Sequence, residues 1–185
     1  MAEGDLGGMA NWAAPEPPSV PSLVGRWVHL RPVVPADYPG LYAMATSPGQ
    51  GYRWRFRGGL PSFDDFVRTI GQGVFLQYLV ESNSDRSALG LAVCYNADFR
   101  NNHAYIALQA SARTSGKGYA LEGGRLLLDY LFSCYDFEKI YAESPEFVID
   151  SFQSGIGARF VEEGRLRNHE RFMGRYWDLY VFAYY

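Results

Sequence analysis

The chain is poor in cysteine, in basic charge and in long apolar runs, and each shortage excludes a class of protein. Among 185 residues there are two cysteines, Cys94 and Cys134, and the formal net charge is −3. Two cysteines in separate apolar segments indicate free, buried thiols and not a disulfide framework. The slightly negative balance predicts no nucleic-acid partner and no polybasic contact with a membrane.

No apolar stretch approaches the ~20 residues that a membrane-spanning helix requires. The first residues show no basic start followed by an apolar run, so we expect no signal peptide. These two observations predict a cytoplasmic protein without a membrane partner. Lysine is also scarce, with only Lys117 and Lys139, which reflects ancestry and carries no chemical message.

The composition that is present fits one globular domain, with 48% hydrophobic and 16% aromatic residues. A chain of this length can bury a sizeable core. Residues 1–22 are rich in Gly, Ala and Pro and have no periodicity, so we predict an N-terminal arm before a single domain at 23–185.

Hydrophobic periodicity predicts a sheet whose strands are interrupted by helices. The predicted strands are 26–31, 74–82, 88–96, 103–110, 139–144, 161–171 and 176–184. The predicted helices are 35–45, 62–70, 118–132 and 147–158. Ser62 and Asp65 have the spacing of a cap on the second helix. The pattern is that of a mixed α/β sheet of about seven strands with four helices.

The segment richest in chemical information is 110–120, Ala-Ser-Ala-Arg-Thr-Ser-Gly-Lys-Gly-Tyr-Ala, between a predicted strand and an amphipathic helix. Backbone N–H groups at a helix N-terminus form an anion site. Gly116 and Gly118 would let the main chain approach a phosphate closely, because they carry no Cβ. Arg113 and Lys117 add positive charge.

Two other nucleotide motifs do not fit this segment. A Walker loop needs glycine at 111 and Ser or Thr at 118, where the chain has Ser111 and Gly118. A dinucleotide fingerprint needs another glycine where Leu121 stands. Taken alone, the segment is consistent with a phosphate cradle and equally with a plain turn before a helix.

The spacing Arg113-x-x-Gly116-x-Gly118 matches the Q/R-x-x-G-x-G/A pattern of the GCN5-related N-acetyltransferase (GNAT) superfamily. Across 24–184 the chain resembles its RimJ/RimL-like branch. Further matching segments follow in the family's order: Leu30-Arg31-Pro32 with Ala36-Asp37, 116–122, 160–167 and 174–178.

The resemblance implies the GNAT fold, with mostly antiparallel strands and a splay between the fourth and fifth strands. It also implies an acyl-CoA donor, most often acetyl-CoA, and direct attack of an amine on the thioester. His103, His169 and the two cysteines do not have the spacing of metal ligands, so we expect no metal. The residues that the resemblance assigns to the donor are Leu108, Ala110, Arg113, Thr114, Ser115, Gly116, Lys117, Gly118, Tyr119 and Ser151.

The sequence departs from the family pattern where proton transfer would be assigned. The family's Asn before the fourth helix is Val148 here, the Gly after that helix is Arg159, and the usual position of an acidic tyrosine is Gly155. The family's fourth-strand acidic residue is Tyr105.

The remaining catalytic candidates are Glu143, His103 and Tyr105. Glu143 or His103 could act as a base through water, and Tyr105 could orient the acceptor or protonate the thiolate. Each also has an ordinary structural explanation, as a solvated strand-end side chain or a packed tyrosine. The family places the acceptor wall near Tyr52, Trp54 and Arg57.

Three functions follow from these observations. The first is an N-acyltransferase acting on the primary amine of a small molecule. The second is a protein N-terminal or lysine acetyltransferase, as the RimJ/RimL resemblance implies. The third is a module that binds acyl-CoA without turnover, because the proton-transfer positions depart from the pattern. A homodimer is compatible with all three.

Overall fold

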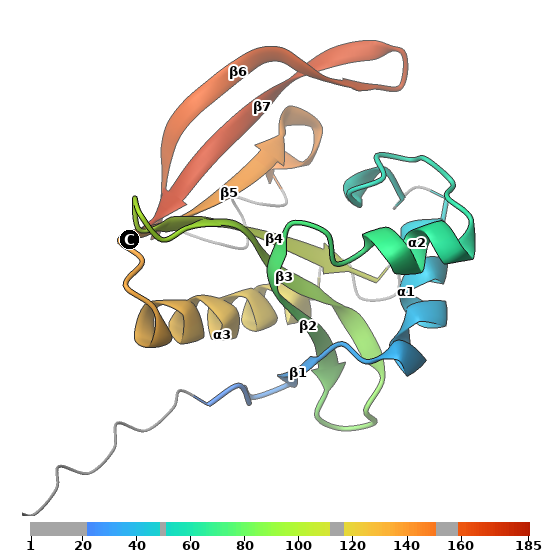
Figure 1. Cartoon of the computed structure of the whole chain (residues 1–185). Helices are drawn as coiled ribbons and strands as arrows, with labels where there is room; N and C mark the ends of the chain where they lie inside the picture. Colours follow the sequence, from blue (N-terminus) through green and yellow to red (C-terminus); the bar gives the residue numbers. More distant parts are fainter. Residues whose placement is uncertain (1–21, 49–50, 112–116, 151–158) are drawn as a thin grey trace, which may run out of the picture.

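The strands form one mixed sheet in which a single neighbouring pair is parallel. The computed structural model describes residues 22–48, 51–111, 117–150 and 159–185. Its strands are β1 (Val28–Pro32), β2 (Val74–Ser82), β3 (Ala88–Asp98), β4 (His103–Ala110), β5 (Lys139–Pro145), β6 (Phe160–Phe172) and β7 (Arg175–Tyr184). They lie in the order β1-β2-β3-β4-β5-β7-β6, and only β4 and β5 are parallel (Figure 1). The predicted sheet of about seven mostly antiparallel strands is confirmed.

Three α-helices accompany the sheet in the described ranges: α1 (Tyr38–Ala45), α2 (Phe63–Thr69) and α3 (Tyr119–Cys134). Short 3₁₀ turns are η1 (Pro35–Asp37), η2 (Gly51–Arg53) and η3 (Glu146–Val148). The predicted cap on α2 is confirmed, because Ser62 Oγ accepts a hydrogen bond from the Asp65 N–H at 3.1 Å. The predicted helix at 147–158 begins in η3, and 151–158 lie outside the described residues.

Helix α3 packs against one face of the sheet through Leu126, Leu127, Leu128 and Leu131. Two glycines allow this close approach. A Cβ at Gly123 would lie 2.8 Å from Val80 Cγ2, and one at Gly124 would lie 2.5 Å from Leu108 Cδ1. The face of α3 that packs on the sheet therefore includes Gly123 and Gly124. A search for apolar side chains does not reveal these two positions.

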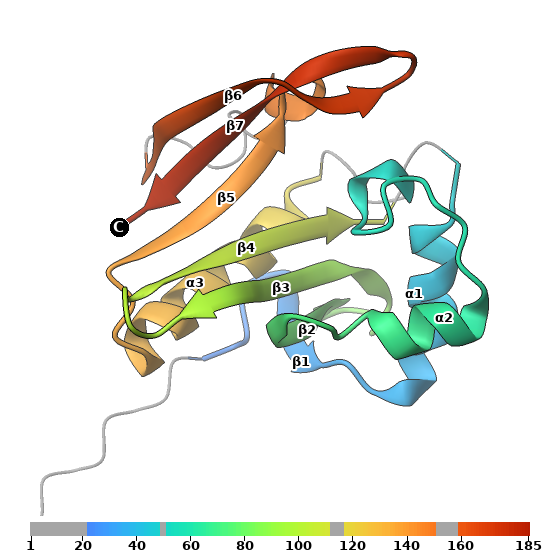
Figure 2. The same cartoon turned by 45° about the horizontal axis from the view of Figure 1, so that its top comes forward.

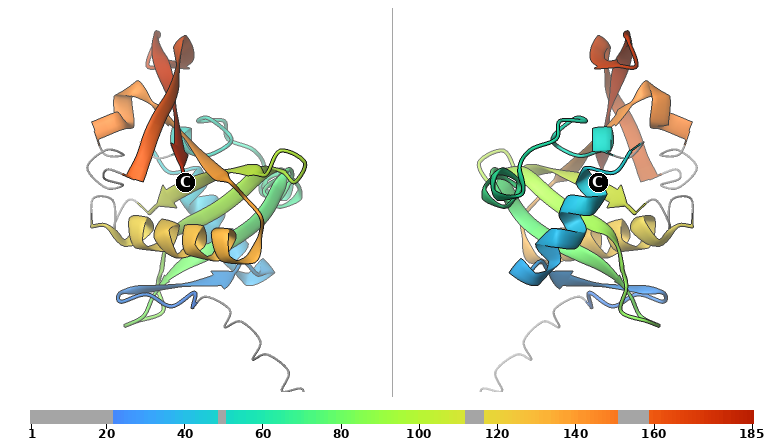
Figure 3. Two further views of the ribbon diagram at one scale, coloured as in Figure 1. Left: turned by 90° about the vertical axis from the view of Figure 1, so that its left-hand side faces the viewer. Right: turned by 90° about the vertical axis from the view of Figure 1, so that its right-hand side faces the viewer.

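The opposite face of the sheet holds a second apolar cluster, built by α1 and α2 over β2 and β3. Its centre consists of Leu41 and Phe66 from the helices, with Leu79 and Leu91 from the strands. The β6–β7 hairpin continues the sheet beyond β5 (Figure 3). Where β7 ends, Tyr184 packs against Phe132 of α3, with ring centroids 5.6 Å apart.

A buried carboxylate fastens β1 to β2. Glu81 Oε2 accepts from Arg31 Nε at 2.6 Å, and Glu81 Oε1 lies 3.1 Å from His29 Nε2 and 2.8 Å from Arg86 Nε. Arg31 also forms a two-bonded contact with Asp37, each bond 2.8 Å long. These groups position the start of the sheet and are remote from the parallel pair.

Both cysteines are free, as predicted, but only Cys94 is buried. The prediction of two buried thiols is wrong for Cys134, because the last residue of α3 faces solvent. None of the helices in the described ranges is long and apolar enough to cross a bilayer.

Candidate active site

Strands β4 and β5 separate halfway along their length. They pair from His103 and Lys139 to Ile106 and Ala142, where the pairing ends. Beyond that point 107–110 stay paired with β3, while 143–145 pair with β7 (Figure 2). The predicted splay is therefore confirmed. Among the described residues no β4–β5 pair follows this point, and diverging strand edges suit a ligand with amide groups.

The N-terminus of α3 follows the open end of β4. Gly118 caps this helix with φ +81°, and among the described residues no heavy atom lies within 4 Å of the position that a Cβ would take. Lys117 and Gly118 are exposed. The first turn of α3 has one acidic side chain, Glu122, which turns back to accept from the N–H groups of Arg26 at 2.6 Å and Trp27 at 3.1 Å. Within the part of the chain that the structure describes, the start of α3 therefore leaves room for an external anion.

The predicted donor residues fall into two groups. Leu108 and Ala110 lie on β4 past the last pair with β5, and Lys117, Gly118 and Tyr119 lie at the start of α3. The structure brings these five to the same end of the sheet. The predicted residues Arg113, Thr114, Ser115, Gly116 and Ser151 lie outside the described residues.

A row of aromatic rings lines the sheet face opposite α3. Tyr105 lies between two other tyrosines, with ring centroids 5.6 Å from Tyr95 and 5.0 Å from Tyr141. All three rings are half-buried. Glu143 follows Tyr141 on the same face of β5, is exposed, and lies one residue past the last β4–β5 pair. A carboxylate therefore stands beside the aromatic row at the mouth of the splay.

The charge of Glu143 acts on this row. Burial raises the pKa of Tyr105 above its usual 10, and the neighbouring Glu143 carboxylate raises that pKa further. Burial and Glu143 also raise the pKa of Tyr95, while Arg57 opposes the effect. Both phenols consequently stay protonated at neutral pH and act as hydrogen-bond donors.

His103 is placed at the closed end of the parallel pair, opposite Lys139. Its Nε2 atom lies 3.9 Å from Asp98 Oδ2, and its ring lies 5.6 Å from Tyr141. Ala107 lies four residues further along the strand, a span of roughly 13 Å. Glu143 and Tyr105 are thus closer to the opening than His103.

The wall that the sequence predicts near Tyr52, Trp54 and Arg57 lies where the η2 region contacts the β6–β7 hairpin. Tyr52 stacks on Phe172 with centroids 4.1 Å apart and meets Phe147 at 5.3 Å. Arg57 Nη2 pairs with Glu170 Oε1 at 2.9 Å. These contacts join η2 to the hairpin, and Tyr52 and Arg57 therefore lie in this wall.

Trp54 does not belong to that wall. Only 3% of this residue is exposed, because it packs into the apolar cluster under α1 and α2. The expectation that Trp54 lines this wall is therefore wrong. Burial of its large apolar ring in the core stabilises the fold more than partial exposure at the wall would.

Several site residues escaped the sequence reasoning. Tyr95 and Tyr141 became visible only through strand register, and Phe172 and Glu170 only through the return of the hairpin over η2. The alternation of β5 could have indicated Tyr141, which shares a face with Glu143. No local pattern could have paired Arg57 with Glu170, since more than a hundred residues separate them.

The described residues fit an acyl-CoA in three ways. The N-terminus of α3 presents N–H groups that suit phosphate, β4 and β5 diverge at a point that suits a ligand with amide groups, and Ser144 carries a buried hydroxyl beside the splay. In the described ranges no group of three or more His, Cys, Asp or Glu side chains could hold a metal ion.

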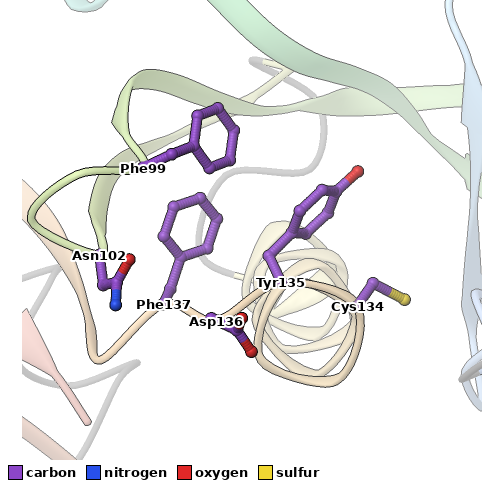
Figure 4. A pocket seen from close by; sticks show the side chains of 6 residues that line it. All are labelled: Phe99, Asn102, Cys134, Tyr135, Asp136 and Phe137. Carbon is purple, nitrogen blue, oxygen red and sulfur yellow. The ribbon is translucent and has the colours of Figure 1, made fainter.

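A separate hollow of about 290 Å³ lies at the other end of α3 (Figure 4). It is lined by Phe99, Asn102, Cys134, Tyr135, Asp136 and Phe137. The 16 residues of α3 span about 24 Å, so this hollow is remote from Gly118. None of the predicted site residues lines it.

Comparison with known proteins places this geometry in a family. The sequence model of the acetyltransferase (GNAT) domain matches residues 28–146. An uncharacterized N-acetyltransferase p20 from Bacillus licheniformis is 31% identical over 86 residues, 46% of this chain and 48% of that protein. The chain thus aligns with about half the length of that curated relative.

Solved structures share the fold at low sequence identity. A spermidine N-acetyltransferase from Vibrio cholerae, in complex with CoA and spermine, superimposes with a TM-score of 0.70 at 21% identity, covering 84% of this chain and 94% of that chain. An acetyltransferase (GNAT family) from Bacillus anthracis gives 0.71 at 18% identity, covering 87% and 96%.

Proposed function

This chain belongs to the GNAT acetyltransferase family, and from that premise we propose that it is an acyl-CoA-dependent N-acyltransferase that uses acetyl-CoA as donor. The observation that carries the proposal is the junction of two features at one end of the sheet. The strands open after Ile106 and Ala142, and α3 begins at the same end with an uncovered glycine cap at Gly118. One feature suits the amides of a pantetheine arm and the other suits a pyrophosphate.

The donor supplies a thioester whose carbonyl carbon is attacked by an amine nitrogen. The new C–N bond replaces the C–S bond, and CoA leaves as a thiolate that takes up a proton. The chain's own part is to position this carbon and to manage a proton. Main-chain N–H groups of β4 beyond Ile106 are placed to polarise a carbonyl oxygen. Glu143 accepts the amine proton, through water, and the neutral phenol of Tyr105 donates a hydrogen bond at the same mouth.

We propose the primary amine of a small molecule as the acceptor. Glu143 is an exposed carboxylate beside a half-buried aromatic row, which favours a cation over an anion. Arg57 does not reverse this preference, because its charge is paired with Glu170. The Vibrio cholerae neighbour, which acts on spermidine, supports a small amine as a class. A protein N-terminus, the acceptor that a RimJ/RimL-like enzyme would use, is the competing acceptor.

Ligand-dependent melting tests the donor. At 100 times its Kd, a ligand that binds only the folded state stabilises it by about 2.7 kcal/mol. CoA and acetyl-CoA should therefore raise the Tm by several degrees, while NAD and ATP should raise it less. No preference for CoA over the two control nucleotides contradicts the donor assignment.

Release of free thiol from acetyl-CoA tests the reaction. Polyamines, amino sugars and peptides with free N-termini form the acceptor panel. Turnover with small amines supports the proposal, and turnover with peptides alone identifies a protein acetyltransferase. CoA binding without turnover on any amine identifies a binding module and contradicts the enzyme.

A further inference from the structure

Ser144 has an unusual position for a hydroxyl group. It lies on β5 with 2% of its surface exposed, two residues past Ala142, the last partner of β4. Among the residues that the structure describes, its buried Oγ atom has no hydrogen-bond partner. Buried hydroxyls are nearly always paired, because an unpaired one has lost its hydrogen bonds to water. This hydroxyl therefore requires an explanation.

The register of the strands places Ser144 in the wall of the splay. Ile140 and Ala142 face the apolar core under α3, and Ser144 follows in the same alternation. If the parallel pairing continued by two residues, Leu108 of β4 would stand opposite Ser144. The strands separate instead, and β5 turns to pair Ser144 with Tyr180 of β7. The hydroxyl thus lies at the point where the sheet opens.

A comparison with another buried serine shows that the fold can satisfy such groups. Ser82 Oγ, at the end of β2, lies 2.9 Å from Ser84 Oγ and accepts from the Ser84 N–H at 3.2 Å. The two serines are similarly buried, at 8% and 2% exposure. Of the two serines, only Ser144 lacks a hydrogen-bond partner among the described residues, and only Ser144 lies beside the splay.

We propose that the Ser144 hydroxyl is a positioning group for the acyl donor, donating a hydrogen bond to an acceptor atom on its pantetheine arm. This inference rests on the proposed function, because it assigns the splay to that arm. It predicts a pair of effects with opposite signs. The hydroxyl opposes folding of the free protein and favours binding of the donor.

The test compares the full chain with S144A. Three quantities are measured: the Tm without ligand, the Kd for CoA, and the Kd for 3′-phosphoadenosine 5′-diphosphate, the nucleotide half of CoA without its arm. In S144A the Tm should stay equal or rise by a few degrees. The Kd for CoA should rise about fivefold, which is about 1 kcal/mol and the typical value of one hydrogen bond. The Kd for the nucleotide half should not change.

S82A serves as the matched control, since it removes a paired buried hydroxyl. Its Tm should fall, and its Kd for CoA should equal that of the wild type. S144C, which keeps the volume of the side chain with a weaker donor, should bind CoA with an intermediate Kd.

The outcomes separate the two proposals. An S144A protein that binds CoA like the wild type contradicts the role of Ser144 and leaves the donor assignment intact. A lower Tm without ligand, or equal weakening of CoA and of its nucleotide half, shows a structural role and also contradicts the inference. A wild-type chain that fails to bind CoA contradicts the proposed function itself.

Discussion

Replacing Gly118 separates a phosphate-binding helix start from an ordinary turn. The residue has φ +81° and open space where a Cβ would stand. A left-handed conformation costs an L-residue roughly 1–2 kcal/mol, so G118V should lower the stability of the free protein by about that amount. In a domain of this size the Tm should fall by roughly 2–8 °C.

The loss of CoA affinity should exceed this strain. A Cβ at position 118 projects into the space where a phosphate would approach the main chain. Losing one hydrogen bond to a charged group costs about 1.5–3 kcal/mol, which is a rise in Kd of roughly 10- to 150-fold. Isothermal titration with CoA measures this rise directly.

Gly73 provides a control with the same backbone strain. It has φ +69° and also has no heavy atom within 4 Å of its Cβ position. It precedes Val74, which pairs with Tyr95 and through it with Tyr105, five residues or roughly 17 Å from Ala110. G73V should therefore lower the Tm like G118V and leave the Kd for CoA unchanged.

Asparagine distinguishes backbone strain from obstruction, because it tolerates the left-handed conformation. G118N should recover most of the Tm and still bind CoA weakly. Recovery of both quantities in G118N would mean that strain alone explained the loss. CoA binding by G118V at the level of G73V would refute the phosphate site at the start of α3.

Three further predictions concern single side chains. E143Q and Y105F should each lower kcat by less than ~10³-fold, and E143Q should have the larger effect. Because burial and Glu143 raise the pKa of Tyr105, Y105F should remove no limb of the pH–rate profile between pH 6 and 9. The loss of a limb in Y105F would contradict this expectation. Breaking the Arg57–Glu170 pair with R57A should raise the KM for the amine and leave the Kd for CoA unchanged. The free energy of unfolding should change by only ~0.2–1 kcal/mol, because the Arg57 side chain is 53% exposed. A change in CoA affinity would place the pair on the donor side. Burial alone would raise the pKa of Glu81, but the hydrogen bond and the charge of Arg31 lower that pKa overall. The stabilisation that ionised Glu81 gives to the folded state is therefore present above its ordinary pKa of 4.5 and is lost as the pH falls through the lowered pKa. In urea unfolding, the difference in stability between wild type and E81Q should narrow between pH 5 and pH 3, and a constant difference would contradict this.

The sequence alone determined the strands and helices and the glycine at the start of α3. Strand and helix periods are local, so the strands at 74–82 and 103–110 were predicted with the bounds that the structure shows. The cap at Ser62 and the glycine at 118 are local as well, because each depends on a few neighbouring residues. The domain bounds, the arm at 1–22 and the donor role of 113–116 stay predictions.

Only the tertiary structure decided which residues lie in the wall near η2 and what surrounds each catalytic candidate. The sequence offered Glu143, Tyr105 and His103 as catalytic candidates without showing their positions. Strand register placed Glu143 and Tyr105 near the opening between β4 and β5, and His103 at the closed end of this strand pair. Trp54 went into the core, and Arg57 was paired with Glu170. Such outcomes depend on contacts between residues far apart in the chain, whose free energy depends on burial and strand register. Burial and register are not visible in a local sequence pattern. The sequence could therefore place the glycine before α3, whereas only the fold could bring η2 and the β6–β7 hairpin together.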